Sequence, residues 1–240
     1  MLKVVFFDAA GTLFDAREPV AVSYARLARR YGVAAEVSSV AAGFHRAFSG
    51  APGLAFGPGR QVAELRELER SWWRERVRDT FTGLGTFSDF DAYFTELFAF
   101  FADPANWALN PDVPALLAGL RRRGLRLGII SNFDYRIYRV LEALGLRSCL
   151  DSVTISSEAG YAKPAAEIFQ TALARHAVLP AAAMHVGDSG PLDLAGAANA
   201  GLAAVLLDPG LGAPMRVSGR TACVSSLRLV PEVICRLKNP

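Results

Sequence analysis

Two observations predict an α/β protein with a mostly parallel sheet and an inserted helical segment. From residue 110 onward, short apolar stretches alternate with segments of helical pattern, which is typical of a parallel sheet covered by helices on both faces. Residues 16–107 instead have a helical pattern throughout, and they follow an isolated apolar stretch at 2–7. We therefore expect residues 2–7 to be a strand of the same sheet and the helical segment to form a cap over it.

The individual elements follow from the apolar patterns and from the prolines and glycines that interrupt them. Pro19 begins the first helix of the insertion and Gly32 ends it. The helices expected in the insertion span 19–31, 36–48, 60–80 and 89–101. Beyond the insertion, Asn110 provides an N-cap and Gly124 ends the helix that follows. The other elements expected there are strands at 125–130, 152–156, 184–186 and 203–207, and helices at 134–145, 164–175 and 191–201.

Composition narrows the class of protein. With 240 residues, 52% of them hydrophobic and 20% charged, the chain is globular and long enough to bury a sizeable core. Its net charge of +3 comes without a basic stripe, and no apolar run approaches about 20 residues, so neither nucleic acid nor a membrane is an expected partner. Cys149, Cys223 and Cys235 lack metal-like spacing, and no secretion signal is apparent, so we expect a cytoplasmic protein. We expect it to be a monomer or a homodimer.

Polar side chains follow the predicted strands at the edge where open parallel sheets bind ligands. In chain order they are Asp8, Ser131-Asn132, Lys163-Pro164, Gly187-Asp188 and Asp193. Each of them alone is more common as a turn, cap or surface residue. Their presence together at strand ends favours an enzyme site.

The residue types in these clusters suit phosphoryl transfer. Asp8 can attack a phosphorus atom and form an aspartyl-phosphate. Asp8, Asp188 and Asp193 supply hard oxygen ligands for Mg²⁺. Lys163 adds a positive charge where negative charge builds up, and Ser131 offers a hydroxyl donor to a phosphate oxygen.

The order and spacing of these motifs resemble the haloacid dehalogenase-like hydrolase superfamily, whose members are mostly Mg²⁺-dependent aspartyl phosphatases. The motifs that carry the resemblance are Asp8-x-x-Gly11-Thr12-Leu13, Ser131-Asn132, Lys163-Pro164 and Gly187-Asp188-x4-Asp193. The resemblance implies a Rossmann-like doubly wound core of residues 1–15 and 108–240, with a mobile helical cap of residues 16–107. It implies a small phosphate ester as substrate and Asp8 and Lys163 as catalytic residues. It further implies substrate binding by Gly11, Thr12, Ser131, Asn132 and Lys163, and Mg²⁺ binding by Asp8, the Ala10 backbone carbonyl, Asp188 and Asp193.

Position 10 departs from the pattern of the family. Most phosphatases of the family have a second aspartate there, which protonates the leaving group and then activates the attacking water. Losing general acid–base catalysis typically costs about 10²- to 10⁴-fold in rate. Ala10 therefore predicts an impaired phosphatase, or one restricted to substrates with good leaving groups. Asp15 is the nearest candidate in sequence to replace the missing acid, and Glu18 and His45 are more distant ones. The resemblance, however, places Asp15 at the hinge of the cap.

Two other functions stay open at this point. Ala10 is compatible with a non-catalytic module that binds Mg²⁺ and phosphate, or a partner protein. The 2-haloacid dehalogenases also lack the second aspartate, but the pair Gly187-Asp188 argues against that activity. Phosphonoacetaldehyde hydrolases have alanine at this position but need a cap lysine, and residues 16–107 contain none.

The insertion is rich in aromatic residues toward its end. The spacing of Phe90, Phe94, Phe98 and Phe101 is helical and indicates packing within the cap. Which of the aromatic residues between 70 and 107 line a substrate pocket or a dimer face stays open.

Overall fold

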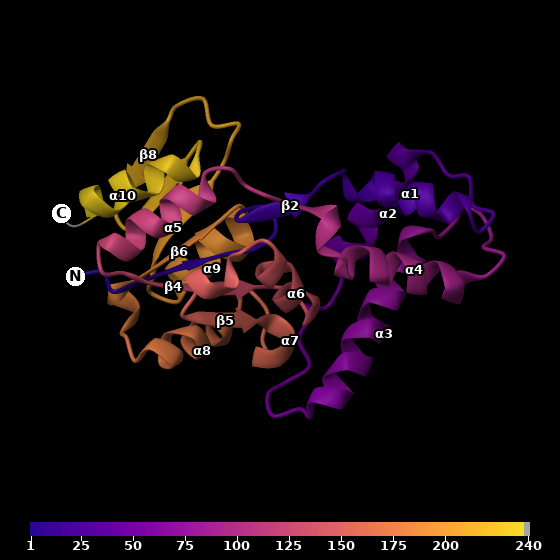
Figure 1. The fold of residues 1–240 in the computed structure, drawn as a ribbon, viewed down its shortest axis with the longest axis horizontal. Helices are drawn as coiled ribbons and strands as arrows, with labels where there is room; N and C mark the ends of the chain where they lie inside the picture. Colours follow the sequence, from indigo (N-terminus) through magenta and orange to yellow (C-terminus); the bar gives the residue numbers. More distant parts are fainter. Residues whose placement is uncertain (238–240) are drawn as a thin grey trace.

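A seven-stranded sheet forms the centre of the larger lobe in the computed structural model, which describes residues 1–237 (Figure 1). Its strands are β1 (Val4–Phe7), β4 (Arg126–Ser131), β5 (Ser152–Ile155), β6 (Ala183–Gly187), β7 (Ala203–Leu207), β8 (Met215–Ser218) and β9 (Thr221–Val224). Their order is β5-β4-β1-β6-β7-β9-β8, and all neighbours are parallel except β8 and β9. The chain fills one side of β1 first and then crosses to the other, so the order of a doubly wound, Rossmann-like fold is confirmed.

Helices cover both faces of this sheet. They are α5 (Val113–Arg122), α6 (Arg136–Ala143) and α10 (Val230–Leu237) on one face, and α8 (Ala166–His176) and α9 (Gly196–Asn199) on the other. Side chains of β1 alternate between the two layers: Val5 and Phe7 join the first, Val4 and Phe6 the second, and all are fully buried. A strand without a polar face is what a sheet covered on both sides requires.

Short helical segments connect these elements. They are α7 (Ser156–Ala159) and 3₁₀ turns at Pro104–Asn106, Arg147–Cys149, Pro180–Ala182 and Leu227–Leu229.

Residues 20–102 form a separate helical unit, drawn to the right in Figure 1. It consists of α1 (Val20–Arg29), α2 (Val37–Ser49), α3 (Val62–Thr80) and α4 (Phe90–Ala102). These helices enclose a core of their own that includes Tyr24, Tyr93 and Phe94. α2 and α3 cross so closely that a Cβ atom at Gly43 would lie 2.1 Å from the Thr80 carbonyl oxygen. The expected helices of the insertion are confirmed in number and approximate position.

A short two-stranded ribbon joins the helical unit to the sheet. β2 (Phe14–Ala16) pairs antiparallel with β3 (Trp107–Leu109), so the chain enters and leaves the unit on adjacent strands. The ribbon is not predicted from the sequence, because strands of three residues are too short to produce a periodic pattern. The predicted boundaries after residues 15 and 107 fall within it, and as domain boundaries they remain a prediction.

Other features also differ from expectation. The hairpin β8–β9 and helix α10, all beyond residue 207, were not predicted. The helix expected over 191–201 begins as a wider π-helical turn, Gly190–Ala195, in which the Asp193 and Leu194 amides both donate to the Ser189 carbonyl. The last part of the predicted core range, residues 238–240, lies outside the described residues.

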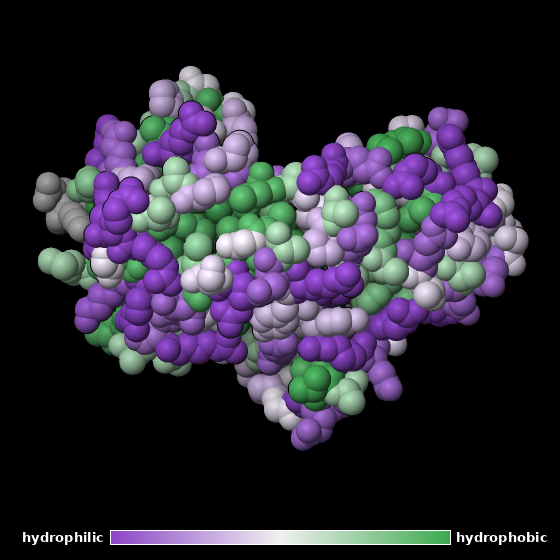
Figure 2. Space-filling model, viewed as in Figure 1, coloured by the Kyte–Doolittle hydropathy of each residue, from purple (hydrophilic) through white to green (hydrophobic). Residues whose placement is uncertain are grey.

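The surface of the molecule is mostly hydrophilic on the face seen in Figure 2. Apolar side chains gather there in the notch near β2, between the sheet and the helical unit. Among residues 1–237, no helix is both long enough and apolar enough to cross a membrane.

Candidate active site

The polar clusters meet at the carboxyl end of β1, at the switch point of the sheet. Phe7 pairs with Ile129 of β4 on one side and with Val186 of β6 on the other, so Asp8 emerges between these two strands. Its amide donates to the Val186 carbonyl at 2.8 Å, which extends the strand pairing to the first site residue. Ligands of open α/β sheets bind at such a position.

Lys163 joins two of the carboxylates. Its Nζ lies 2.6 Å from Asp8 Oδ1 and 2.6 Å from Asp193 Oδ1, and only 4% of the residue is exposed. Burial alone would lower the pKa of Lys163, but the charges of Asp8 and Asp193 raise it above its usual value. The side chain is therefore a buried ammonium ion that holds two anions in place.

Asn132 fixes the backbone that carries Lys163. Its Oδ1 accepts from the Lys163 amide at 2.7 Å and its Nδ2 donates to the Lys163 carbonyl at 3.0 Å. Asn132 is predicted from the sequence to bind substrate, and in the structure its amide group is engaged with the backbone of Lys163.

Three carboxylates converge beside this lysine. One oxygen each of Asp8, Asp188 and Asp193 lies within 4.8 Å of the others. Partial burial of the Asp188 carboxyl group, followed by the charges of Asp8 and Asp193, raises the pKa of Asp188 to about 6, although the residue as a whole is exposed. A set of close, mutually repelling oxygen ligands fits a hard divalent cation such as Mg²⁺.

Two glycines make room for these carboxylates. Gly11 has φ +88°, and a Cβ atom there would lie 2.4 Å from Asp188 Oδ2. A Cβ atom on Gly187 would lie 2.2 Å from Asp193 Cγ. Any side chain at either position would displace an acidic group of the cluster.

The two hydroxyl residues predicted to bind substrate lie at the same edge. The Thr12 hydroxyl donates to Asp188 Oδ1 at 3.4 Å, and Thr12 is fully buried. Ser131 is the last residue of β4 and is 3% exposed. Thr12 thus orients a carboxylate, whereas Ser131 lies two residues beyond Ile129, the residue of β4 that pairs with Phe7.

His185 belongs to the site although no motif pointed to it. It lies in the middle of β6, is fully buried, and its Nε2 is 2.7 Å from Asp193 Oδ1. Burial lowers the pKa of His185 in spite of the nearby Asp193 carboxylate, so the ring is neutral at pH 7 and donates from Nε2. Burial opposes the ionisation of Asp193, but the bond from His185 and the charge of Lys163 hold its pKa well below the usual range.

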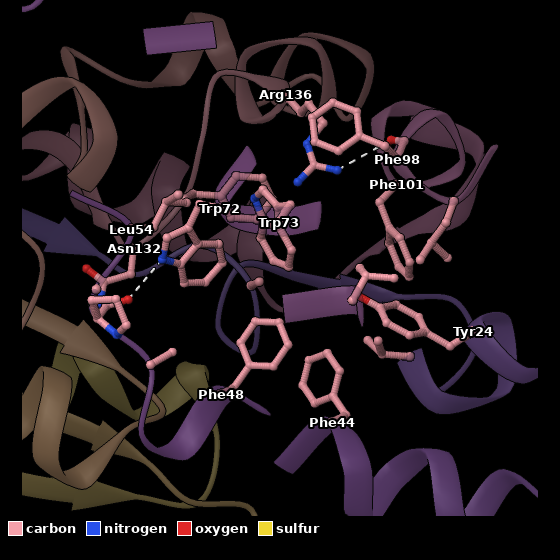
Figure 3. Close-up of a pocket in the computed structure, with 18 of the residues that line it drawn as sticks. Tyr24, Phe44, Phe48, Leu54, Trp72, Trp73, Phe98, Phe101, Asn132 and Arg136 are labelled. Carbon is pink, nitrogen blue, oxygen red and sulfur yellow. Dashed lines mark hydrogen bonds between the residues drawn. The ribbon is translucent and has the colours of Figure 1, made fainter. Parts of the chain in front are cut away.

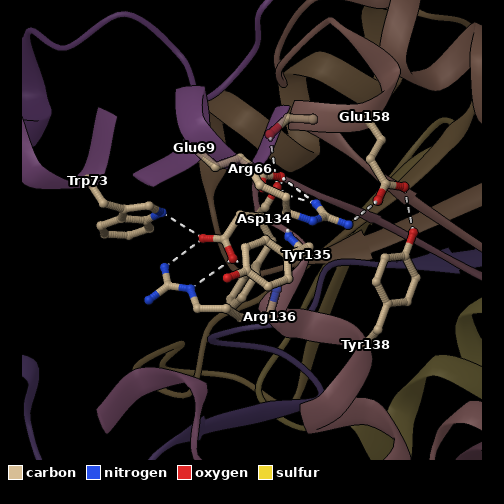
Figure 4. A network of polar contacts seen from close by, with 10 residues as sticks. Arg66, Glu69, Trp73, Asp134, Tyr135, Arg136, Tyr138 and Glu158 are labelled. Carbon is tan, nitrogen blue, oxygen red and sulfur yellow. Dashed lines mark hydrogen bonds and ion pairs between the residues drawn. The ribbon is translucent and has the colours of Figure 1, made fainter. Parts of the chain in front are cut away.

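A second polar network ties the helical unit to the loop after Asn132 (Figure 4). Asp134 is fully buried and accepts from Arg136 Nε at 2.8 Å, from Arg136 Nη2 at 2.6 Å and from Trp73 Nε1 at 2.6 Å. Nearby, Glu69 of α3 accepts from the Tyr135 amide at 3.3 Å and from Arg66 at 3.0 Å. From the sequence, Asp134 is expected only to begin a helix.

Replacing Asp134 with alanine is expected to destabilise the protein strongly. Arg136 is 5% exposed and would be left buried without its carboxylate, which costs about 3–5 kcal/mol. Thermal unfolding should show the melting temperature falling by roughly 10 °C. Glu232→Ala is the control, because it breaks an exposed pair with Arg236 and should shift the melting temperature by less than about 2 °C. Equal shifts in both variants would contradict a structural role for the buried network.

A cavity of about 640 Å³ begins at the site and extends into the helical unit (Figure 3). Ala10, Asn132 and Lys163 line its inner end. Among the described residues, no aspartate, glutamate or histidine lines it, and Asp15, Glu18 and His45 are outside the lining. Tyr24 does line it, but burial raises the pKa of that phenol well above its usual value. None of the substitutes considered for the missing acid reaches the cavity.

The chain is similar to known proteins both in sequence and in structure. A model of the haloacid dehalogenase-like hydrolase family matches residues 2–201. The haloacid dehalogenase-like hydrolase domain-containing protein 3 of Bos taurus is 34% identical over 213 residues, which cover 86% of this chain and 82% of that protein. The glyceraldehyde 3-phosphate phosphatase of Methanothermobacter thermautotrophicus is 28% identical over 223 residues, covering 87% and 86%. The crystal structure of a 2-haloacid dehalogenase from Pseudomonas syringae superimposes with a TM-score of 0.66 at 26% identity, covering 98% and 99%.

Proposed function

The chain belongs to the haloacid dehalogenase-like hydrolases, and from that premise we propose that it is an Mg²⁺-dependent phosphatase of small phosphate esters. The reaction proceeds through a phosphorylated Asp8. The observation that carries the proposal is the contact of one buried lysine with two of three converging carboxylates at the switch point of the sheet. The glyceraldehyde 3-phosphate phosphatase among the relatives supports the phosphatase class.

In the first step of the proposed reaction, a carboxylate oxygen of Asp8 attacks phosphorus, and the bond between phosphorus and the leaving oxygen breaks. Lys163 orients Asp8 for this attack and offers positive charge beside the phosphoryl group. Water then attacks the phosphorus of the aspartyl-phosphate, which releases phosphate and regenerates Asp8. The helical unit acts as the cap that encloses the substrate. The location that we expect for the protein is the cytoplasm.

Asp8, Asp188 and Asp193 are the groups that would hold Mg²⁺, and the family pattern adds the Ala10 backbone carbonyl to them. The cation would neutralise charge on the phosphoryl group. Thr12 and His185 serve this set indirectly, because each donates a hydrogen bond to one of its carboxylates.

Hydrolysis of p-nitrophenyl phosphate tests this function most directly, because its leaving group departs with little need of a proton. We expect activity with Mg²⁺ and its loss, to below about 1% of the starting rate, when EDTA removes the metal, since the acidic cluster then repels the substrate. Adding excess Mg²⁺ should restore the rate. Undiminished hydrolysis in EDTA would contradict a metal-dependent mechanism.

A second candidate is hydrolysis of a carbon–halogen bond, which needs no proton donor. The absence of acids from the described cavity lining favours it, and the 2-haloacid dehalogenase is a structural relative. Chloride release from a 2-haloacid that persists in EDTA would support this function. Ligand-induced stabilisation by Mg²⁺ and phosphate without turnover of either substrate class would instead support a non-catalytic binding module.

A further inference from the structure

The cavity that begins at Lys163 has a largely apolar lining. Beyond its inner end, its walls are mostly rings and aliphatic side chains from the helical unit (Figure 3). Figure 3 shows Phe44, Phe48, Trp72 and Trp73 turned toward the same space. Phe44 and Phe48 stack with centroids 4.1 Å apart, and the Phe48 ring lies 5.7 Å from that of Trp72. The rings therefore form one connected aromatic wall.

The cavity offers no free charge to a second ionic group of a ligand. Lys163 and Arg136 are the only ionisable acids or bases of its described lining apart from the Tyr24 phenol. Lys163 already pairs with two carboxylates. The Arg136 guanidinium pairs with Asp134 and lies 3.8 Å from the centre of the Phe98 ring. An alcohol that carries an ionic group of its own would lose the hydration of that group in this space without gaining a partner.

The small side chain at position 10 joins this apolar space to the reacting group. Ala10 lines the cavity together with Asn132 and Lys163, so a phosphate ester held at Asp8 would direct its organic part past Ala10 into the aromatic wall. The space of about 640 Å³ is in the range that holds a whole drug-sized organic ligand.

We infer that the substrates are phosphate monoesters of uncharged, apolar alcohols that are good leaving groups, above all aryl phosphates with more than one ring. This inference rests on the proposed phosphatase function and specifies its substrate class. Asp8 attacks phosphorus, the bond from phosphorus to the aryl oxygen breaks, and the electron pair departs on that oxygen as a phenolate. The phenolate needs no acid at position 10, and it takes its proton from solvent after release.

Kinetics with matched esters test the inference. Phenyl phosphate and 2-naphthyl phosphate release phenols of similar acidity but differ by one fused ring, so their ratio of kcat/KM isolates the apolar contact. We expect 2-naphthyl phosphate to be favoured about tenfold or more, through a lower KM. The kcat/KM of O-phosphoserine, whose alcohol carries ionic groups of its own, should be at least about 100-fold lower than that of 2-naphthyl phosphate. Acetyl phosphate is the reference, because acetate departs without a proton and occupies little of the cavity.

The outcomes separate this inference from the function on which it rests. The enzyme could hydrolyse acetyl phosphate but show no preference for 2-naphthyl over phenyl phosphate, or it could prefer O-phosphoserine. Either result overturns the substrate class and leaves the phosphatase function in place. If no ester is hydrolysed, the proposed phosphatase function is wrong, and a binding measurement then decides the ligand class.

The binding measurement uses intrinsic fluorescence, because Trp72, Trp73 and Trp107 are the chain's only tryptophans and all line the cavity. Cyclohexylmethylphosphonate, which does not absorb at the excitation wavelength, should change the emission saturably and at a concentration at least about tenfold lower than methylphosphonate. Equal responses to the two phosphonates would overturn an apolar ligand class.

A pair of variants connects the preference to the aromatic wall. Phe48 and Phe90 are both partly buried phenylalanines of the helical unit, but only Phe48 lines the cavity. Phe48→Val should reduce the ratio of 2-naphthyl to phenyl phosphate kcat/KM by about fivefold. Phe90→Val should keep the wild-type ratio. The same ratio in both variants would show that the aromatic wall does not select the substrate.

Discussion

An Asp8→Asn variant is expected to lose at least about 10⁴-fold in kcat on every phosphate ester that the wild type hydrolyses. The amide cannot form the aspartyl-phosphate, and it also removes one charge from the proposed metal ligands and the ion pair with Lys163. The measurement is steady-state hydrolysis of p-nitrophenyl phosphate in saturating Mg²⁺, with melting temperatures to establish that the variant is folded.

Asp91→Asn is the matched control for Asp8→Asn. It makes the same chemical change at a carboxylate of α4 whose side chain is 71% exposed and pairs with Arg74. Its activity should stay within about twofold of the wild type, since an exposed ion pair contributes little. More than a tenth of the wild-type rate in Asp8→Asn would exclude Asp8 as the nucleophile.

Ala10→Asp should have the opposite effect, a gain in activity. The new carboxyl group would enter the cavity at its inner end and supply a proton donor and water-activating base, which no described residue of the cavity lining provides. We expect kcat on alkyl phosphates, which have poor leaving groups, to rise by about 10²- to 10⁴-fold. On p-nitrophenyl phosphate the gain in kcat/KM, which reports on formation of the phosphorylated enzyme, should be much smaller, because that step needs little acid there.

Ala10→Asn separates proton transfer from a change of shape. Asparagine has nearly the same size as aspartate but cannot transfer the proton, so it should not increase the rate on alkyl phosphates. Comparable gains from asparagine and aspartate would mean that polarity or packing at position 10, and not acid–base catalysis, limits the enzyme. Activity that appears only in Ala10→Asp would favour a binding module as the wild-type function.

The sequence predicted the fold well where patterns were long and failed where they were short. The buried strands of the sheet and the four helices of the helical unit each have a clear apolar period or a helix boundary residue, and they are found as expected. The ribbon of β2 and β3 has three residues in each strand, and its pairing joins parts of the chain too far apart for any local pattern to reveal.

The candidate site was predictable only for residues that follow strands. Asp8, Lys163 and Asp193 were recognised because polar residues at strand ends are conspicuous, and these three are in direct contact. His185 escaped notice because a single histidine within an apolar strand resembles a core residue until its partner is known. The cavity could not be predicted, because its walls come from helices whose relative placement no local pattern determines.

The ribbon of β2 and β3 has a consequence for how proteins of this architecture diversify. Ala16 and Trp107 are direct neighbours across the ribbon, so all the intervening chain begins and ends at one place on the molecule. Paired strand residues are only about 5 Å apart, close enough for a tight turn to join them. Evolution can therefore exchange or remodel the whole intervening segment as a cassette without altering the register of the central sheet. The same junction offers protein engineers a natural site for grafting a foreign recognition unit onto an unchanged central sheet and its helices.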